Sequence, residues 1–450
     1  MTWRLLLSCA LLLSSLTRSA IAQITVVDGV ELIDGTGGPP ITDAALVIDS
    51  GRIARVMQTD PSAYPAGARV VHYAGRTIIP GLIDDHMHFG LLNGVRVDSA
   101  NYSRANVQRQ MARLIGYGVT TVISLGANRD ILYAVRDDAR AGKVAGPRIL
   151  TADHGIGVTG GVPPFAVGSE QVARPTTPDE ARAAVRAMAT RHADLVKIWV
   201  DDFYGRYPKM LPEIYTAVID EAHRQHLRVA AHVFYLDDAK ALVDAGVDIL
   251  AHSVRDRPVD AALIDAMKRR GVWYIPTLTV DESYFVFGDS PAWMNDRFFT
   301  AALDSGVLGW LRSPAYLDSL RSNPRLAAYK AYFAMAQRNL KTLADSGVRI
   351  GFGTDGGAFP TRVQGFAEHR ELALMVGAGL TPAQALACAT GHAAELAGVD
   401  GTTGTLEPGK AADFLVLAGD PLTDISNTTR LVAIWQAGRD VAPLVPGGGR

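Results

Sequence analysis

Eight short apolar runs, separated by helical patterns, fill the middle of this 450-residue chain and constrain its fold more than any other feature. Near-continuous apolar runs are typical of parallel β-strands that are buried on both faces. Eight successive strand–helix units predict an α/β fold of the (β/α)8 TIM-barrel class, with catalytic groups at the carboxyl ends of the strands. An open, doubly wound sheet is the alternative. The runs lie in TIIPGLIDDHMH, VTTVISLG, PRILTADHG, LVKIWV, RVAAHVF, VDILAHS, VWYIPTL and VRIGFGTD.

The segments between these runs carry helix signals. Thr177 precedes Pro178, and Glu180 follows two residues later, a pattern that caps and begins an α-helix. The stretch DDAKALVDAG lies between His232 and His252 and has the length of one helix. The spacing of these two histidines therefore corresponds to one compact strand–helix unit.

The two ends of the chain differ from the middle. Residues 23–76 and 399–450 contain β-rich runs separated by Gly, Pro and Asp, which reads as short strands and turns. Because the two segments flank the middle, we expect them to form one small β-sandwich domain. The barrel domain would then span residues 77–398.

Residues 1–22 have the features of a secretory signal peptide. Arg4 provides a positive charge, Leu5 to Leu16 is mostly apolar, and Ala20 and Ala22 form a small-residue cleavage site. The apolar stretch is short for a bilayer span, so we predict cleavage after Ala22 and no membrane association afterwards; an uncleaved anchor is the alternative. The mature chain would keep one cysteine and no disulfide, which suits the periplasm or secretion.

Six potential metal ligands follow or end the apolar runs, which places them at the carboxyl ends of the predicted strands. Nitrogen and oxygen donors without a thiolate suit zinc, with manganese, iron or cobalt as alternatives. Six donors are enough for two divalent cations, and two cations can generate hydroxide from water at neutral pH. The pattern therefore indicates a hydrolase. The six residues are His86, His88, Lys197, His232, His252 and Asp355.

His86 and His88 are separated by one residue of a strand, so their side chains point to the same side. Asp85 is expected to orient the strand end or a histidine ring rather than bind metal. Lys197 lies inside the apolar run LVKIWV, where a buried ammonium would be costly. We interpret Lys197 as a carbamate, formed with carbon dioxide, that bridges the two cations; a lysine at the barrel rim is the alternative.

The six donors divide into two sets. The Lys197 carbamate would join His232 and His252 around one cation, and His86, His88 and Asp355 would hold the other. Asp355 has a second predicted role, because a carboxylate beside the attacking water can accept its proton and pass it to the leaving nitrogen.

Three further residues are predicted to contact the substrate. His154 follows the third strand beside a glycine-rich loop, where it would contact the substrate or polarise the scissile carbonyl. Tyr235 and Arg255 each lie three residues beyond a predicted histidine ligand, so a phenol and a guanidinium could bind a substrate carboxylate. A rim salt bridge is the alternative for Arg255. The aromatic-rich segment 280–316 is expected to pack mostly against the barrel, with a few rings in an apolar pocket.

The residues at these strand ends resemble the amidohydrolase superfamily. The resemblance rests on the HMH sequence at 86–88, on Lys197, His232, His252 and Asp355, on the opening VDGVELIDGTGG, and on the closing ATGHAAELAGV and GTLEPGKAADFLVL. Within the superfamily the chain is similar to the imidazolonepropionase-like and prolidase-like group, which includes ochratoxin-type amidases and dipeptidases. The resemblance implies a barrel with a small β-sandwich, two divalent metals and hydrolysis of an amide-like bond. Lys197 favours the two-metal amidase branch.

These observations predict an exported binuclear amidohydrolase that acts on a dipeptide or an N-acyl amino acid. A lactone or phosphoester hydrolase with the same metal centre and a non-catalytic periplasmic binding protein are the alternatives. The net charge of −2 gives no indication of a nucleic-acid partner. We expect a small-molecule substrate and a homo-oligomeric assembly.

Overall fold

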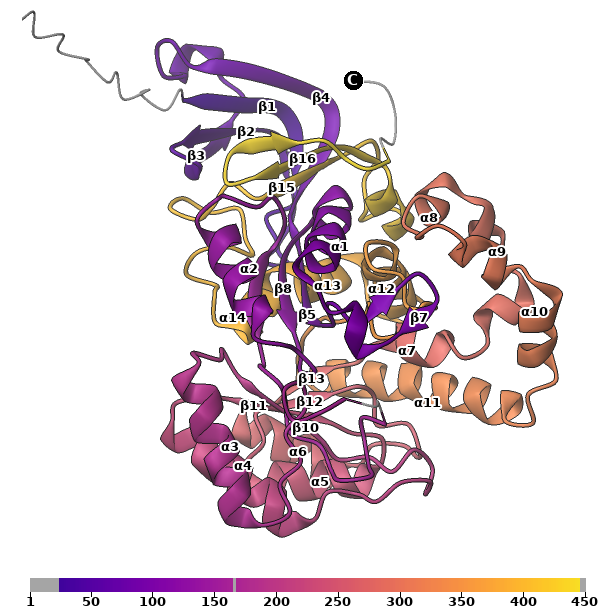
Figure 1. The fold of residues 1–450 in the computed structure, drawn as a ribbon. Helices are drawn as coiled ribbons and strands as arrows, with labels where there is room; N and C mark the ends of the chain where they lie inside the picture. The colour runs from indigo at the N-terminus through magenta and orange to yellow at the C-terminus, as the bar shows by residue number, and fades with distance from the viewer. Residues whose placement is uncertain (1–23, 165–166, 446–450) are drawn as a thin grey trace, which may run out of the picture.

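The computed structural model describes residues 24–164 and 167–445 (Figure 1). The predicted signal peptide lies outside the described residues. A β-sheet built from both ends of the chain lies at one end of the molecule, next to the alternating strands and helices of the middle segment. Among the described residues, no helix combines the length and apolar character needed to cross a bilayer.

All eight predicted runs form parallel strands. Three of them pair in one sheet, in the order β5 (Leu82–Met87), β8 (Val119–Ser124) and β9 (Arg148–Thr151). The other five pair in chain order in a second sheet, which consists of β10 (Val196–Trp199), β11 (Val229–His232), β12 (Ile249–Ala251), β13 (Trp273–Ile275) and β14 (Arg349–Ile350). Their side chains are almost all buried, as expected for strands covered on both faces.

Backbone hydrogen bonds connect the two sheets beyond the strand ends. The Asp85 amide donates to the Phe352 carbonyl at 2.9 Å, which ties β5 to the segment after β14. The Ile156 amide donates to the Lys197 carbonyl at 2.8 Å, which ties the segment after β9 to β10. These contacts bring the carboxyl ends of strands from both sheets to one place.

A helix follows each strand and covers the sheets from outside (Figure 1). Thr177 caps α3 by accepting from the Glu180 amide, as predicted. The predicted helix between His232 and His252 is also present and ends at Gly246, whose φ of 97° requires a residue without a Cβ. The covering helices are α1 (Arg104–Gly116), α2 (Ile131–Arg140), α3 (Pro178–Thr190), α4 (Pro212–Arg224), α5 (Leu236–Ala245), α6 (Ala261–Arg270), α11 (Leu326–Asp345), α12 (Phe366–Gly377), α13 (Pro382–Ala387) and α14 (Ala393–Ala397).

The β-rich ends pair in one seven-stranded sheet, as two segments far apart in the sequence. The described strands give one sheet here, so the division into the two facing layers of a sandwich stays a prediction. A hairpin of β6 (Leu92–Asn93) and β7 (Arg96–Val97) lies apart from it. The order is β17 (Arg439–Val441), β16 (Leu431–Gln436), β15 (Phe414–Leu417), β4 (Arg69–Pro80), β1 (Thr25–Leu32), β2 (Ile41–Asp49) and β3 (Arg52–Gln58).

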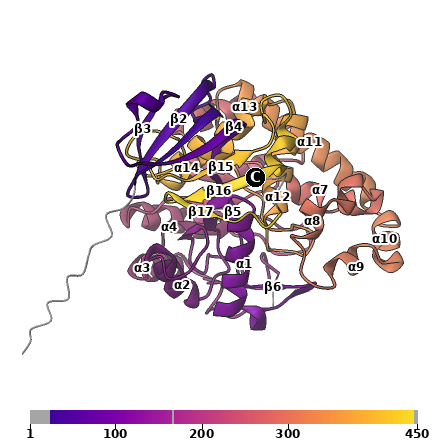
Figure 2. The same cartoon turned by 90° about the horizontal axis from the view of Figure 1, so that it is seen from above.

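A long helical segment separates β13 from β14 and extends along one side of the molecule (Figure 2). Its aromatic side chains mostly pack with one another, whereas the sequence predicted packing against the barrel. Phe287 and Phe299 are buried in a cluster that Tyr117 joins from the position directly after α1. Tyr284 is an exception, because it lines a cavity. The segment contains α7 (Leu278–Glu282), α8 (Arg297–Thr300), α9 (Val307–Leu311), α10 (Pro314–Arg321) and α11.

The core of the seven-stranded sheet supplies a stability prediction. Trp435 is buried and stacks on Phe414, with ring centroids 5.3 Å apart. We expect Trp435→Ala to lower the free energy of unfolding by about 3–5 kcal/mol, because it leaves a large cavity. Val70→Thr, on the partly exposed β4 position, should change it by about 0.5 kcal/mol or less. Urea denaturation of both variants checks this; similar stability of the two would contradict it.

Candidate metal centre

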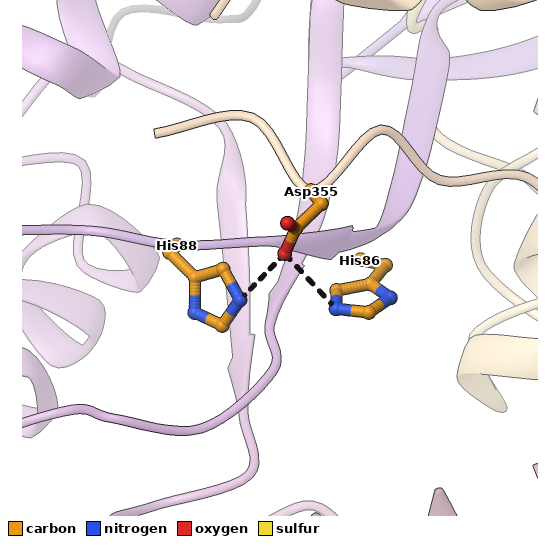
Figure 3. A group of neighbouring side chains, drawn as sticks. All are labelled: His86, His88 and Asp355. Atoms are coloured by element: carbon orange, nitrogen blue, oxygen red, sulfur yellow. Dashed lines mark ion pairs between the residues drawn. The ribbon is translucent and has the colours of Figure 1, made fainter. Parts of the chain in front are cut away.

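Three predicted ligands form a compact group. Asp355 lies between His86 and His88, with its Oδ1 atom 3.3 Å from His86 Nε2 and 2.9 Å from His88 Nε2 (Figure 3). One ligand atom from each residue lies within 4.8 Å of the others. All three side chains are buried. A divalent cation at this position would be within reach of two imidazoles and one carboxylate.

Backbone contacts fix this group. The alternation of β5 places His86 and His88 on the same side, and the Asp355 amide donates to the His86 carbonyl at 2.6 Å. Asp84 accepts from the His86 amide at 2.9 Å and from the Thr354 hydroxyl at 2.6 Å. Asp84 therefore joins β5 to the loop that carries Asp355.

Asp84 takes the role that the sequence analysis assigned to Asp85. Both carboxylate oxygens of Asp85 are buried without a hydrogen-bond partner among the described residues. The prediction that Asp85 orients the strand end is therefore wrong. The reason is the two-residue period of the strand, which turns neighbouring side chains to opposite faces; Asp84 shares its face with His86.

Glycines allow the Asp355 loop to approach β5 closely. A Cβ on Gly353 would lie 2.6 Å from the Cβ of His86, and one on Gly357 would lie 2.2 Å from the His88 carbonyl oxygen. Asp355 itself has a φ of 55°, an uncommon backbone conformation that tends to occur at functional sites.

His232 and His252 lie beside the first group. The ring centroids of His232 and His252 are 4.2 Å apart, and those of His86 and His252 are 4.4 Å apart. His232 Nε2 lies 3.0 Å from an Asp201 carboxylate oxygen, and His252 Nδ1 lies 2.7 Å from the Thr277 hydroxyl. Such partners fix the orientation of a ligand ring. They leave Nδ1 of His232 and Nε2 of His252 to face a cation.

Lys197 is buried within the same cluster. Its Nζ atom has no hydrogen-bond partner among the described residues, and its side chain is 0% exposed. Burial lowers the pKa of Lys197 to about 7. A substantial fraction of the amine is then neutral at neutral pH, which is the form that can react with carbon dioxide. The surroundings therefore suit the predicted carbamate.

The protonation states of the other donors also suit a cation. Burial, followed by the Lys197 charge, holds the pKa of His86 well below its usual range. Burial and the neighbouring imidazoles do the same for the pKa of His252. Burial opposes ionisation of Asp355, but Arg362 and the two imidazoles hold the pKa of Asp355 well below its usual range. Neutral imidazoles and an ionised carboxylate are the forms that bind divalent metals.

A cavity of about 60 Å³ opens over these residues. Its walls are largely aromatic and carry two guanidinium groups. Arg255 lies in this wall and already has two partners. Its Nε lies 2.8 Å from an Asp281 carboxylate oxygen, and its Cζ lies 4.6 Å from the centre of the Phe234 ring. The aromatic residues of the wall are Trp199, Phe203, Tyr204, Phe234, Tyr284 and Phe359.

Two predicted substrate contacts are not among the residues that line the cavity. The Tyr235 hydroxyl donates to an Asp202 carboxylate oxygen at 2.9 Å. His154 Nε2 lies 3.2 Å from an Asp130 carboxylate oxygen. The structure thus groups His86, His88 and Asp355 as a possible metal site, with His232 and His252 beside them, but it directs Tyr235 and His154 to carboxylates outside the cavity.

Several residues of the centre were missed by sequence reasoning. Arg362 forms an ion pair with the second carboxylate oxygen of Asp355, and its Nη2 donates to the Tyr284 hydroxyl at 3.4 Å. Asp201 and Thr277 orient the histidine rings. Asp201 directly follows the predicted run LVKIWV, and Thr277 lies near the end of the predicted run VWYIPTL. That placement is the signal in the sequence that could have indicated them.

The comparisons with known proteins agree with this geometry. Residues 77–439 match the amidohydrolase family, which is more than half of the chain. The chain belongs to the amidohydrolase family. As a family member it is a hydrolase that acts on carbon–nitrogen bonds, which confirms the predicted enzyme class. The family also contains metal-dependent enzymes, and the His86, His88 and Asp355 group is a possible metal site.

Relatives from several sources share most of the chain with this amidohydrolase. It is 27% identical to an ochratoxinase from Aspergillus niger, over 93% of this chain and 86% of the relative. A putative prolidase from Bifidobacterium longum is 28% identical and superposes with a TM-score of 0.75, over 96% of this chain and 97% of that structure. A Xaa-Pro dipeptidase, 24% identical, has the same fold with a TM-score of 0.75, over 93% of this chain and 100% of that structure.

The buried amine gives a prediction for Lys197. We expect both Lys197→Ala and Lys197→Met to lose bound metal and activity together, because neither side chain can supply an anionic ligand; Met also keeps the apolar volume. Added short carboxylic acids should partly restore both properties in Lys197→Ala. Elemental analysis and turnover measurements check this. Full metal content and normal turnover in Lys197→Met would show that the amine is only structural.

Proposed function

We propose that this protein is an exported amidohydrolase with two divalent metal ions, most simply zinc, that hydrolyses the amide bond of a dipeptide or an N-acyl amino acid. The observation that carries the proposal is the convergence of six buried donors, including an unpartnered lysine amine, below one cavity. We infer that the eight parallel strands close into the (β/α)8 barrel of the family. Cleavage after Ala22, a periplasmic or secreted location and a homo-oligomeric assembly belong to the same proposal.

The proposed ligand sets are supported by the contacts among the side chains. His86 and His88, through Nε2, and Asp355, through Oδ1, would hold one ion. The Lys197 carbamate would contact both ions, with His232 and His252 completing the second set. When bound, such a pair of ions polarises the scissile carbonyl and lowers the pKa of water.

The chain's own residues then provide orientation and proton transfer. Asp355 lies at the meeting point of the centre and the cavity, so it can hold the proton taken from water and deliver it to the leaving nitrogen. Arg362 keeps the Asp355 carboxylate ionised, which is the form that can act as a ligand and proton acceptor. Asp201 and Thr277 keep the imidazoles of His232 and His252 in place.

The names of the relatives support an amide substrate. Ochratoxinase and prolidase are the names of proteins at 27% and 28% identity. A carboxylate on the substrate would find two guanidinium groups in the cavity wall, Arg255 and Arg362. Both are already paired, Arg255 with Asp281 and Arg362 with Asp355, so a substrate carboxylate would have to share one of them with its present partner. A contact with Tyr235 or His154 would require those side chains to turn away from their present carboxylate partners.

The test of the proposed reaction is a substrate screen. Purified protein supplied with zinc and bicarbonate should hydrolyse members of a library of dipeptides and N-acyl amino acids. Each hydrolysed amide should then be compared with its matched ester and lactone. Hydrolysis of esters or lactones alone would replace the proposal with the alternative hydrolase, and zinc binding without hydrolysis of any class would favour a binding protein.

The donor set predicts the metal content. We expect about two divalent ions per chain and complete loss of activity on chelation, with recovery when zinc is added. The measurement is elemental analysis of the active protein before and after dialysis against a chelator. One ion or none in a fully active preparation would contradict the two-metal proposal.

The position of Asp355 predicts a catalytic defect with little loss of substrate binding. Asp355→Asn keeps the shape of the side chain and removes the proton acceptor, so kcat should fall by about 10²–10⁴. Asp179→Asn, on an exposed side chain at the start of α3, is the matched control and should behave as wild type. Steady-state kinetics with metal analysis of each variant check this. Normal kcat in metal-loaded Asp355→Asn would assign proton transfer to another group.

A further inference from the structure

The short helix α7 contacts both halves of the candidate metal centre. Just before it, the Thr277 hydroxyl lies 2.7 Å from His252 Nδ1. Two residues later, the Thr279 hydroxyl donates to the Thr354 carbonyl at 3.0 Å. Thr354 directly precedes Asp355 in the chain. Two threonines at the start of α7 therefore contact a ligand of one set and the loop that carries a ligand of the other.

Thr277 adopts an unfavourable backbone conformation. Its φ of 46° and ψ of 53° lie in the left-handed region, which is strongly disfavoured for a β-branched residue. Strained residues persist only where the surrounding structure holds them in place. In this conformation the Thr277 hydroxyl contacts the His252 ring. A neighbouring group must stabilise the backbone for this contact to persist.

Glu371 on α12 is that group. Its Oε1 accepts from the Leu278 amide and its Oε2 from the Thr279 amide, each at 2.7 Å. The side chain is buried. The first amides of a helix have no partner within the helix, so one carboxylate completes the start of α7 with both of its oxygens. No side chain of α7 itself does this; the helix has no side-chain cap.

We propose that Glu371 is a positioning residue that aligns His252 and the Asp355 loop through α7 and thereby sets the metal affinity of the centre. The inference rests on the proposed metal centre. In this proposal the start of α7 couples the two ligand sets, although Glu371 accepts from the α7 amides rather than from a predicted ligand. Loss of a group that orients metal ligands typically weakens metal binding by about 10–100-fold.

The other end of α7 offers a matched control. Glu282 is also a buried glutamate, and its Oε2 accepts from Arg370 Nε at 2.9 Å. This ion pair joins α7 to α12, as Glu371 does, but it involves neither Thr277 nor Thr279. Glu282→Gln therefore disturbs the same pair of helices without disturbing the start of α7.

The experiment compares zinc binding of wild type, Glu371→Gln and Glu282→Gln by competition with a chromogenic chelator, together with the melting temperature of each metal-free protein. We expect Glu371→Gln to lose about 10–100-fold in zinc affinity and to lower kcat more than it changes KM. Glu282→Gln should keep wild-type zinc affinity even if its melting temperature falls. Wild-type zinc affinity in Glu371→Gln, with only a lower melting temperature, would reduce Glu371 to a structural helix cap and overturn the inference.

Thr277 variants test the same connection if Glu371→Gln does not fold. Thr277→Val removes the hydroxyl that meets His252, whereas Thr277→Ser keeps it. Zinc affinity should fall in the first and remain in the second; equal affinity in both would overturn the inference. Absence of zinc from the wild-type chain would instead contradict the proposed centre itself, so the two failures are distinguishable.

Discussion

Burial of the Lys197 amine is the constraint on which the rest of the centre depends. A charged amine that is removed from water without a partner is costly, so it loses its proton or gains a compensating group. Lys197 lies on β10 with its Nζ unpartnered among the described residues, and burial lowers its pKa to about 7. Such an environment needs a strand that is covered on both faces. The helix-covered parallel strands provide it, and they also bring four imidazoles and Asp355 to the same place.

Ligands and orienting groups come from different parts of the chain. The ligands lie on or just after strands, where the backbone is fixed by pairing with its neighbours. Two of the orienting groups lie in a loop and on a helix: Thr277 lies beside His252, and Glu371 of α12 accepts from the first amides of α7. Asp84 is the exception, because it holds the Asp355 loop from strand β5 itself. Ligands on strands keep their positions, whereas the loops and helices around them can vary.

The cavity over the centre is small for its proposed substrate. Its volume of about 60 Å³ is well below the roughly 300–1,000 Å³ of ligand pockets. Aromatic side chains from several loops form its walls, and Tyr204 stacks on Tyr332 of α11, with centroids 5.6 Å apart. The side chains that line the cavity therefore limit the size of the molecule that fits in this conformation.

The sequence by itself determined the eight strands, the helices between them and the six donors, because apolar runs and helix signals are local patterns and strand ends meet at one place in a parallel α/β fold. The tertiary structure alone decided which side chains face the cavity. It directed Tyr235 and His154 to Asp202 and Asp130, paired Arg255 with Asp281, and brought Arg362 and Tyr284 to Asp355. It also showed that Asp84, and not Asp85, supports the centre. These outcomes depend on loop conformations and on contacts between distant segments, such as Glu371 with the start of α7, and no local pattern in the sequence encodes them.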